Sequence, residues 1–208
     1  MKLTWIGHSC FKLESNGYTL ILDPYEDNYM PGLAPVRERA DAVFCSHEHS
    51  DHNGRETVTL KQDSAPSPFT VTEIHTWHDE AQGTKRGTNC IRIFDDGSYR
   101  VAHLGDLGCE LEPEQTEQLK GLDAVMIPVG GFYTIDAAQA KALIDQIQPR
   151  VTIPMHYRGE SFGYDVLGTL EDFTALCDCV VEYPGNSIEL NEEMLQQVAV
   201  VKPQNIAI

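Results

Sequence analysis

Basic residues are scarce in this sequence. Its 208 residues include 15 lysines and arginines against 32 aspartates and glutamates, a formal net charge of −17 at pH 7. Proteins that bind nucleic acids need clustered Lys and Arg along one face, where they displace counterions from the phosphates. The charge balance therefore argues against a nucleic-acid partner and favours a small-molecule one.

Long hydrophobic runs are also lacking. No stretch approaches the roughly 18 apolar residues of a membrane-spanning helix, and residues 1–5, Met-Lys-Leu-Thr-Trp, lack the regions of a signal peptide. We therefore expect no membrane partner and a cytoplasmic location. The six cysteines include no C-x-x-C pair, so we expect reduced thiols packed as small hydrophobic residues. A homo-oligomer is left open.

Short strand patterns come first along the chain, and strand–helix alternation follows. Strands are expected at residues 2–6, 9–14, 18–23, 42–45, 69–74, 90–94, 99–103, 124–128, 151–154 and 179–183. Helix starts are expected near Pro113, after Asp136 and after Thr169, while 53–68 reads as a loop. This order predicts an α/β sandwich with the sheets in the middle. No linker-like change in composition occurs, so one domain over residues 1–208 is expected.

Three of the eight histidines fall within the six residues His47-Glu48-His49-Ser50-Asp51-His52. Neighbouring imidazoles repel when protonated and compete for donors when neutral. A metal ion removes both difficulties, because neutral imidazole is the commonest metal ligand and carboxylate suits a hard divalent ion. Alternate side chains of an extended segment share a face, so His47 and His49 can bind one ion. Asp51 and His52, after the chain turns, can bind a second.

The H-x-H-x-D-H pattern resembles the signature of the metallo-β-lactamase superfamily. The resemblance implies an αββα sandwich of the metallo-β-lactamase type with two metal ions at one edge of the sheets. Further residues match the family pattern in order along nearly the whole chain. The implied ligands are His47, His49 and His78 for the first ion, Asp51, His52 and His156 for the second, and Asp106 between them. Asp23 matches an aspartate that braces the metal loop.

Three more histidines lie near the implied ligands. His75 competes with His78 as third ligand of the first ion, and His78 is favoured because the family places this histidine directly before an acidic–glycine loop. His8 follows a predicted strand and is expected to act as a catalytic residue near the metals or the substrate, with a surface turn as the alternative. His103 is expected on the far side of its strand from the metals.

The expected chemistry is hydrolysis. Two divalent ions about 3.5–4 Å apart share a hydroxide, since metal binding lowers the pKa of water from near 16 to about 7. Asp51 can orient that hydroxide and accept its proton. We therefore expect a binuclear metal-dependent hydrolase of a small ester, lactone or phosphoester. Zinc or manganese is expected, with iron as an alternative, because His and Asp ligands suit all three metals.

The chain is most similar to the small stand-alone hydrolases of the superfamily, whose relatives include ascorbate-6-phosphate lactonase and the N-acylphosphatidylethanolamine phospholipases D. The similarity rests on Trp5–Ser9, Pro128–Gly131 and Pro154–Tyr157. Four residues near the implied ligands are candidates for binding an anionic substrate: Lys85, Arg86, Arg158 and Tyr157. Arginine matches phosphate or carboxylate with two hydrogen bonds. The alternative is that the basic residues balance nearby acids, and that Tyr157 packs in the core.

Two other functions remain open. A mononuclear iron branch of the superfamily oxidises persulfides with the same H-x-H-x-D-H pattern, so an iron thiol or persulfide oxidoreductase is one alternative. A non-catalytic metal-dependent sensor is the other, although structural zinc sites close with four ligands and leave no open position. The metal identity tests the first alternative, and turnover of an ester panel tests the second.

Overall fold

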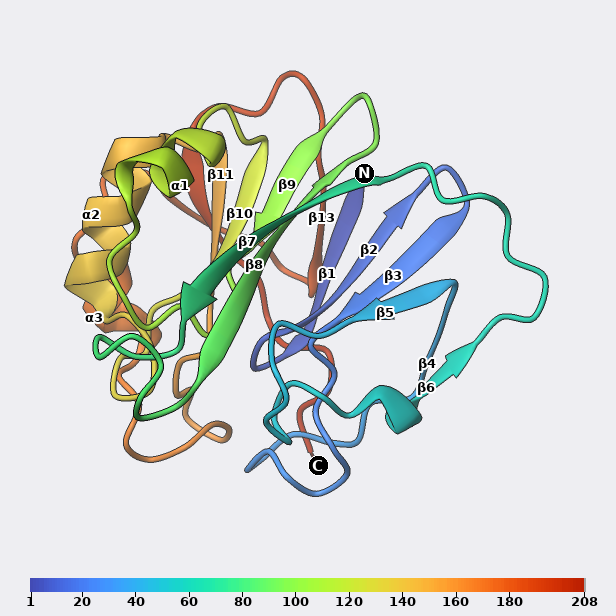
Figure 1. Ribbon diagram of the computed structural model, residues 1–208, viewed down its shortest axis with the longest axis horizontal. Coiled ribbons are helices and arrows are strands. Elements are labelled where there is room, and N and C mark those ends of the chain that lie inside the picture. Colours follow the sequence, from blue (N-terminus) through green and yellow to red (C-terminus); the bar gives the residue numbers. More distant parts are fainter. Residues whose placement is uncertain (208) are drawn as a thin grey trace.

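Two β-sheets pack face to face in the computed structural model, which describes residues 1–207 (Figure 1). The first sheet has the strand order β13-β1-β2-β3-β5 and the second the order β12-β14-β11-β10-β9-β8-β7. The first sheet comprises β1 (Lys2–Gly7), β2 (Cys10–Ser15), β3 (Tyr18–Leu22), β5 (Ala42–Phe44) and β13 (Ser187–Glu189). The second comprises β7 (Thr70–Trp77), β8 (Thr88–Asp95), β9 (Arg100–His103), β10 (Ala124–Pro128), β11 (Val151–Met155), β12 (Val180–Glu182) and β14 (Gln197–Val200).

The first sheet is buried on both faces. Trp5, Phe11 and Leu20 face the main hydrophobic cluster, which they share with residues of the second sheet. Their neighbours Ile6 and Ile21 point the other way, into a second cluster. Successive side chains of a strand alternate between faces, so two apolar faces in this sheet require a cover on each side.

The two outer faces of the sandwich are covered differently. Helices α1 (Pro113–Gln118), α2 (Ala137–Ile147) and α3 (Leu170–Thr174) lie together beside the second sheet (Figure 1). The outer cluster of the first sheet is instead completed by Tyr25, Met30, Leu33 and Val36, from the irregular segment between β3 and β4. The predicted α/β sandwich is confirmed, with α-helices on one outer face and an irregular cover on the other.

Helix α2 begins where the sequence predicts. Asp136 accepts a hydrogen bond from the backbone N–H of Gln139 (2.9 Å), whose side chain accepts one from the backbone N–H of Asp136 (3.0 Å). This reciprocal capping box satisfies two donors at the start of the helix. The helix ends at Ile147, and Gln148 adopts a left-handed φ of 47° directly before Pro149.

Several short elements were not predicted. Strands β4 (Glu38–Ala40) and β6 (Val58–Leu60) form a separate parallel pair, and the 3-10 helix η1 (Arg55–Thr57) precedes β6. The expected loop at 53–68 is therefore partly wrong. The omitted strands β4, β6 and β13 have three residues each and β14 has four, too few to show an alternating pattern. The cysteine expectation also needs correction, because Cys179 is exposed while Cys10, Cys45 and Cys90 are buried.

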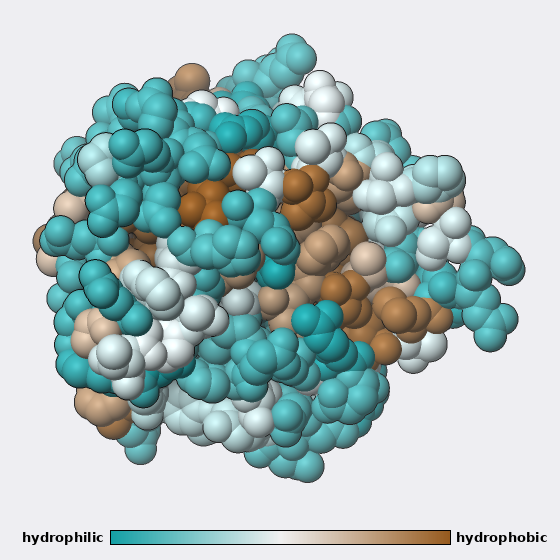
Figure 2. Space-filling view, in the orientation of Figure 1, coloured by the Kyte–Doolittle hydropathy of each residue, from teal (hydrophilic) through white to brown (hydrophobic). Residues whose placement is uncertain are grey.

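The two sheets contact each other where β5, an edge strand of the first sheet, packs against β8, the second strand from the edge of the other. The ring of Phe44 contacts that of Phe94 edge-on, with centroids 5.4 Å apart, and the Arg92 guanidinium donates to the Cys45 carbonyl oxygen (2.6 Å). Hydrophilic side chains cover most of the face seen in Figure 2, and hydrophobic ones gather near its middle, over β5. These contacts bring the chain after β5 close to the second sheet.

Within residues 1–207, none of the helices combines the length and the apolar character that crossing a bilayer requires.

Candidate metal centre

The candidate ligands and their supports directly follow the ends of strands from both sheets. His8 follows β1, Asp23 follows β3, His78 follows β7 and His156 follows β11. The H-x-H-x-D-H segment begins three residues after β5, and Asp106 three residues after β9. The core packs the sheets so that these ends meet at one edge of the sandwich, toward the lower part of Figure 1.

His47, His49 and His78 form the first group of candidate ligands. Each offers a ring nitrogen, and these nitrogens lie within 4.8 Å of one another. His47 Nε2 lies 3.1 Å from His49 Nδ1. His47 and His78 are buried while His49 is exposed, so the group opens toward solvent on one side. His75 is exposed on β7 and lies outside the group.

A second group contains His8, Asp51, His52 and His156, whose ligand atoms also lie within 4.8 Å of one another. Asp106 lies between the two groups. One of its oxygens is 3.3 Å from both His78 Nε2 and His156 Nε2. The other is 3.1 Å from His52 Nε2. The carboxylate of Asp106 is therefore within reach of both groups.

The unpaired atoms of the centre fit metal ions. Within residues 1–207, His52 Nε2, both ring nitrogens of His8 and of His156, and Asp106 Oδ1 are buried without a hydrogen-bond partner. Buried polar atoms are normally hydrogen-bonded, because an unpaired one loses its hydrogen bonds to water and gains none in the protein. Ligand atoms on a tetrahedral zinc ion with bonds of 2.0–2.1 Å lie about 3.3 Å apart, close to the 3.1–3.4 Å found around Asp106 and between His8 and Asp51.

The charges of the centre also favour the binding of cations, because its carboxylates are ionised while several of its histidines are neutral. Burial lowers the pKa of His47 to about 3 and that of His8 to about 4, which keeps both in the neutral form that binds metals. Asp106 is buried, which favours its neutral form, but His156 and His52 bring its pKa well below the usual range. His52 shows the opposite response: burial opposes its charge, yet Asp106 and Asp51 raise its pKa. Divalent ions would supply the charge that these carboxylates require.

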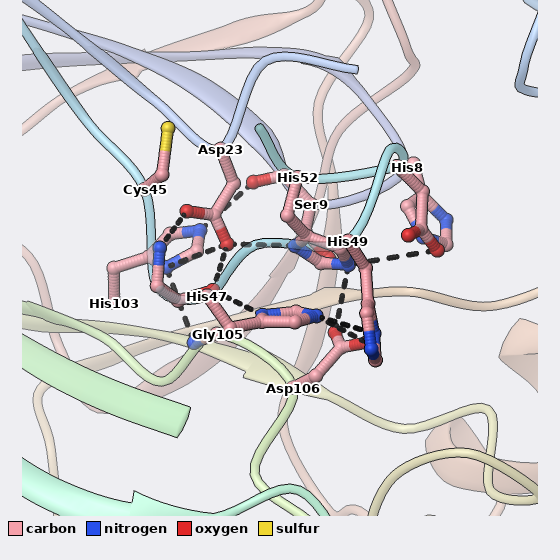
Figure 3. A network of polar contacts seen from close by, with 12 residues as sticks. His8, Ser9, Asp23, Cys45, His47, His49, His52, His103, Gly105 and Asp106 are labelled. Carbon is pink, nitrogen blue, oxygen red and sulfur yellow. Dashed lines mark hydrogen bonds and ion pairs between the residues drawn. The ribbon is translucent and has the colours of Figure 1, made fainter. Parts of the chain in front are cut away.

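Asp23 holds the metal-binding segment in place (Figure 3). It accepts hydrogen bonds from the backbone N–H of Ser46 (2.6 Å), the Ser46 hydroxyl (2.5 Å) and His52 Nδ1 (2.7 Å). Burial alone would raise the pKa of Asp23, but His103 and His52 lower it to about 2, so the acceptor is ionised. The bond to His52 Nδ1 directs His52 Nε2 toward Asp106, as outer carboxylates orient ligating histidines.

His103 connects two turns of the centre. Its Nε2 donates to the carbonyl oxygen of Ser9 (2.8 Å), and its Nδ1 accepts from the backbone N–H of Gly105 (3.2 Å). It is buried and belongs to neither group of candidate ligands. Gly105 has a φ of +56°, and a Cβ there would lie 2.4 Å from Ser46 Cβ. The turn before Asp106 therefore requires glycine.

Three residues of the centre have left-handed backbones. The φ angles are 52° at His8, 44° at Asp23 and 54° at His156. This region is uncommon for residues with a side chain and clusters at functional sites. In each case the residue directly follows a strand, so the left-handed turn redirects the chain where the side chain enters the centre.

A pocket of about 430 Å³ opens in front of the centre. Its lining includes four candidate ligands, His49, Asp51, His78 and Asp106. Arg86 and three tyrosines, Tyr29, Tyr133 and Tyr164, also line it. The pocket reaches more of the first group than of the second, because His8, His52 and His156 are absent from this lining.

Arg86 is the only basic residue among those that line the pocket in the described chain. Its guanidinium lies 5.5 Å from the centroid of the Tyr133 ring, a cation–π arrangement. The loop that carries it is shaped by Asp79, which accepts hydrogen bonds from four backbone N–H groups, including that of Arg86 (2.7 Å). One positive side chain thus faces a space whose lining also carries three acidic residues, Glu48, Asp51 and Asp106.

Three of the four candidate substrate contacts lie elsewhere. Lys85 pairs with Glu80 at the surface. The Arg158 Nε donates to the Leu167 carbonyl oxygen (3.3 Å), and Tyr157 is buried in the main cluster. Closeness to a ligand in sequence misled the prediction, because neighbouring side chains point in different directions. For His8 only the alternative, a surface turn, is wrong: the side chain is buried among the candidate ligands, and it does not line the pocket.

Sequence reasoning missed Tyr29 and Tyr164. Tyr29 belongs to the irregular segment over the first sheet, and Tyr164 to the loop after β11. Neither has a periodic pattern or a motif that would have marked it. Tyr133, two residues after the Gly130-Gly131 pair, also lies on the pocket.

The fold and the centre define an α/β sandwich protein with six imidazoles and two carboxylates gathered for metal binding at one edge. The chain belongs to the β-lactamase superfamily: the family model described as "Beta-lactamase superfamily domain" matches residues 2–156. The predicted family is thereby confirmed.

Sequence relatives and solved structures agree with this assignment. The chain is 31% identical to a UPF0173 protein of Pyrococcus furiosus, over 76% of this chain and 83% of that protein. It is 27% identical to a UPF0173 metal-dependent hydrolase of Archaeoglobus fulgidus, over 92% and 100%. A crystal structure from Thermotoga maritima, described as a proposed zinc-dependent hydrolase of the metallo-β-lactamase superfamily, has 32% identity, a TM-score of 0.73 and coverage of 96% and 97%.

Proposed function

We propose that the chain uses two divalent metal ions, zinc or manganese, to hydrolyse a small anionic ester, lactone or phosphoester. In coarser terms it is a metal-dependent hydrolase, the activity named for relatives from Archaeoglobus fulgidus and Carboxydothermus hydrogenoformans. The observation that carries the finer proposal is the position of Asp106, within 3.3 Å of histidines from both ligand groups.

The residues present can hold both ions. His47, His49 and His78 would bind the first, Asp51, His52 and His156 the second, and Asp106 would contact both. Such a pair of ions lowers the pKa of water toward neutrality and polarises a carbonyl or phosphoryl oxygen. Asp23 and His103 stand behind these ligands and fix the orientation of His52 and of the turn before Asp106.

Asp51 is placed to accept the proton of the attacking water. Its side chain lines the pocket and is 15% exposed, whereas that of Asp106 is 2% exposed. Burial alone would raise its pKa, but His52 and His8 bring it below the usual range, so the carboxylate is ionised. An ionised carboxylate at the pocket wall can orient a water molecule and accept its proton.

Arg86 and the tyrosines indicate the substrate class. A pocket of about 430 Å³ is at the small end of ligand sites, which commonly run to about 1,000 Å³. The chain carries a net charge of −17, so an anionic substrate needs a dedicated positive group, and Arg86 is the one on the lining. Tyr29, Tyr133 and Tyr164 add hydroxyls that can donate to substrate oxygens.

The first test is metal content joined to a substrate panel. Protein purified without chelators or metal-affinity resin should contain close to two zinc or manganese ions per chain by elemental mass spectrometry. It should hydrolyse phosphorylated or carboxylated esters and lactones faster than neutral counterparts of the same size.

Each other outcome removes a stated part of the proposal. A single iron with sulfite production from persulfides would replace hydrolysis by oxidation. Two ions with no turnover across the panel would favour a sensor. Turnover without preference for anionic substrates would refute the role of Arg86 and leave the metal chemistry intact.

A further inference from the structure

We propose that His8 is a direct ligand of the second metal ion, which it binds together with Asp51, His52 and His156. This inference rests on the proposed function, because it requires an ion in the second group. His8 lies outside the H-x-H-x-D-H segment and enters the centre from the end of β1, 148 residues before His156. The ligand atoms of the four residues lie within 4.8 Å of one another.

Without a metal ion, the imidazole of His8 would be buried and left without hydrogen bonds. The side chain is fully buried, and within residues 1–207 neither ring nitrogen has a hydrogen-bond partner. Its ring centroid is 4.1 Å from that of His156 and 5.4 Å from that of His52. Three imidazoles this close, with unpaired nitrogens, are expected only where a shared ion satisfies them.

The distance between His8 and Asp51 distinguishes two roles for His8, a ligand of the metal ion or a hydrogen-bonded partner that orients Asp51. His8 Nε2 lies 3.4 Å from Asp51 Oδ2. A charge-assisted hydrogen bond between a ring N–H and a carboxylate is shorter, about 2.7–2.9 Å. Two ligand atoms bonded to one ion at 2.0–2.1 Å, with an angle near the tetrahedral value between them, are about 3.3 Å apart. The measured separation therefore fits two ligands of one ion better than a hydrogen-bonded pair.

The backbone fixes His8 in this position. Its carbonyl oxygen accepts from Trp5 Nε1 (2.9 Å) and from the backbone N–H of His156 (3.3 Å). Trp5 is fully buried, so the left-handed turn at His8 is anchored in the main core. Because His156 donates to the backbone of His8, the two candidate ligands hold each other in register across the two sheets.

His8 as a ligand would make the two metal sites unequal. Apart from Asp106, which would contact both ions, the second ion would have four protein ligands, His8, Asp51, His52 and His156, of which only Asp51 lines the pocket. The first group has three histidines, and two of them line the pocket. We therefore expect the second ion to be the more tightly held and the first to be the one that substrate reaches.

The variant test compares His8→Asn with His75→Asn. Asparagine tolerates the left-handed backbone of position 8 but removes the imidazole, and His75 is an exposed histidine outside both groups. In competition with a chelator, His8→Asn should bind its second ion at least about tenfold more weakly than wild type, since even outer-sphere changes cost 10–100-fold. His75→Asn should match wild type.

A second measurement needs no folded variant. In the zinc-loaded wild-type protein labelled with 15N-histidine, nitrogen chemical shifts distinguish metal-bound from free ring nitrogens. Six of the eight histidines, His8 among them, should each show one metal-bound nitrogen. His75 and His103 should show none.

The outcomes separate this inference from the proposed function. Two ions per chain with both His8 nitrogens free of metal would overturn the role of His8 and leave the binuclear hydrolase standing. One ion per chain, bound by His47, His49 and His78 alone, would overturn the binuclear proposal and the inference with it. Equal chelator resistance of His8→Asn and wild type would also overturn the role of His8.

Discussion

Replacement of Arg86 by methionine should reduce activity on anionic substrates and spare neutral ones. Arg86 is the only Lys or Arg on the pocket lining of the described chain, and its guanidinium lies over the ring of Tyr133, another lining residue. Methionine has a similar length and keeps apolar contact with the ring, but it removes the charge and all five N–H donors. The change therefore isolates recognition of the anion from the shape of the pocket.

The size of the effect follows from the exposure of Arg86. A hydrogen bond to a charged group contributes about 1.5–3 kcal/mol, equivalent to roughly 10- to 150-fold in kcat/KM. Arg86 is only partly buried, and solvent screens partly exposed charges. We therefore expect the lower part of this range, roughly 10- to 30-fold, for a phosphorylated ester or lactone, and a change below about twofold for its neutral counterpart.

The assay measures kcat/KM for such a matched pair of substrates with wild type, Arg86→Met and Lys85→Met. Lys85 is the matched control, because it is the adjacent basic residue and pairs with Glu80 at the surface instead of facing the pocket. Arg86→Met and Lys85→Met each remove one positive charge, so a long-range charge effect would appear in both variants. The reasoning is refuted by equal losses on the anionic and the neutral substrate, or by equal losses in the two variants.

Three further variants test the support of the centre. His49→Ala removes a ligand of the first group, so elemental analysis should find about one ion fewer per chain and turnover should fall at least about 100-fold; retention of both ions would contradict the assignment. Asp23→Asn replaces an acceptor of Ser46 N–H and His52 Nδ1–H and should weaken metal binding about 10- to 100-fold, as a chelator titration would show. Although burial raises the pKa of Asp79, its backbone hydrogen bonds lower it below the usual value. The ionised group therefore stabilises the fold above the unfolded pKa of about 3.9, and this contribution is lost as the pH falls through the lower folded pKa. Urea unfolding of the metal-free protein should show Asp79→Asn less stable than wild type at pH 7, with the difference closing below about pH 4; a difference that persists unchanged would contradict this sign.

The sequence was most informative where ligands are close along the chain. The two-residue spacing predicted that His47 and His49 share a face, and the structure has their nitrogens 3.1 Å apart, although the chain bends at residues 46–49 and is not extended there. His78, Asp106 and His156 have no such local relation to the segment. Their place in the centre depends on which strands are neighbours, and only resemblance to a family suggested them.

Side-chain direction at the strand ends could not be predicted. Tyr157 and Arg158 adjoin His156 in sequence, yet the left-handed turn at His156 directs the chain away from the pocket, and Tyr157 packs on Trp5 with ring centroids 5.3 Å apart. Tyr164 reaches the pocket because the loop after β11 returns to it. Such directions depend on tertiary packing, which a strand pattern does not contain.

The residues with left-handed backbones link the geometry of the centre to the packing of the core. His8 and His156 occupy a conformation that glycine adopts without cost, yet the metal binding that we propose requires their side chains. Asp23 has the same conformation because its carboxylate must reach Ser46 and His52. Backbone strain of this kind persists only where the surroundings fix it.

Here the core fixes that strain. Trp5 Nε1 donates to the His8 carbonyl oxygen, and the backbone N–H of Asp23 donates to the carbonyl oxygen of Phe44 (2.9 Å). A large-to-small change at Trp5 would therefore disturb the second ligand group as well as the packing. A loss of metal affinity in a core variant that stays folded would reveal this coupling, because packing and ligand geometry share the same turn.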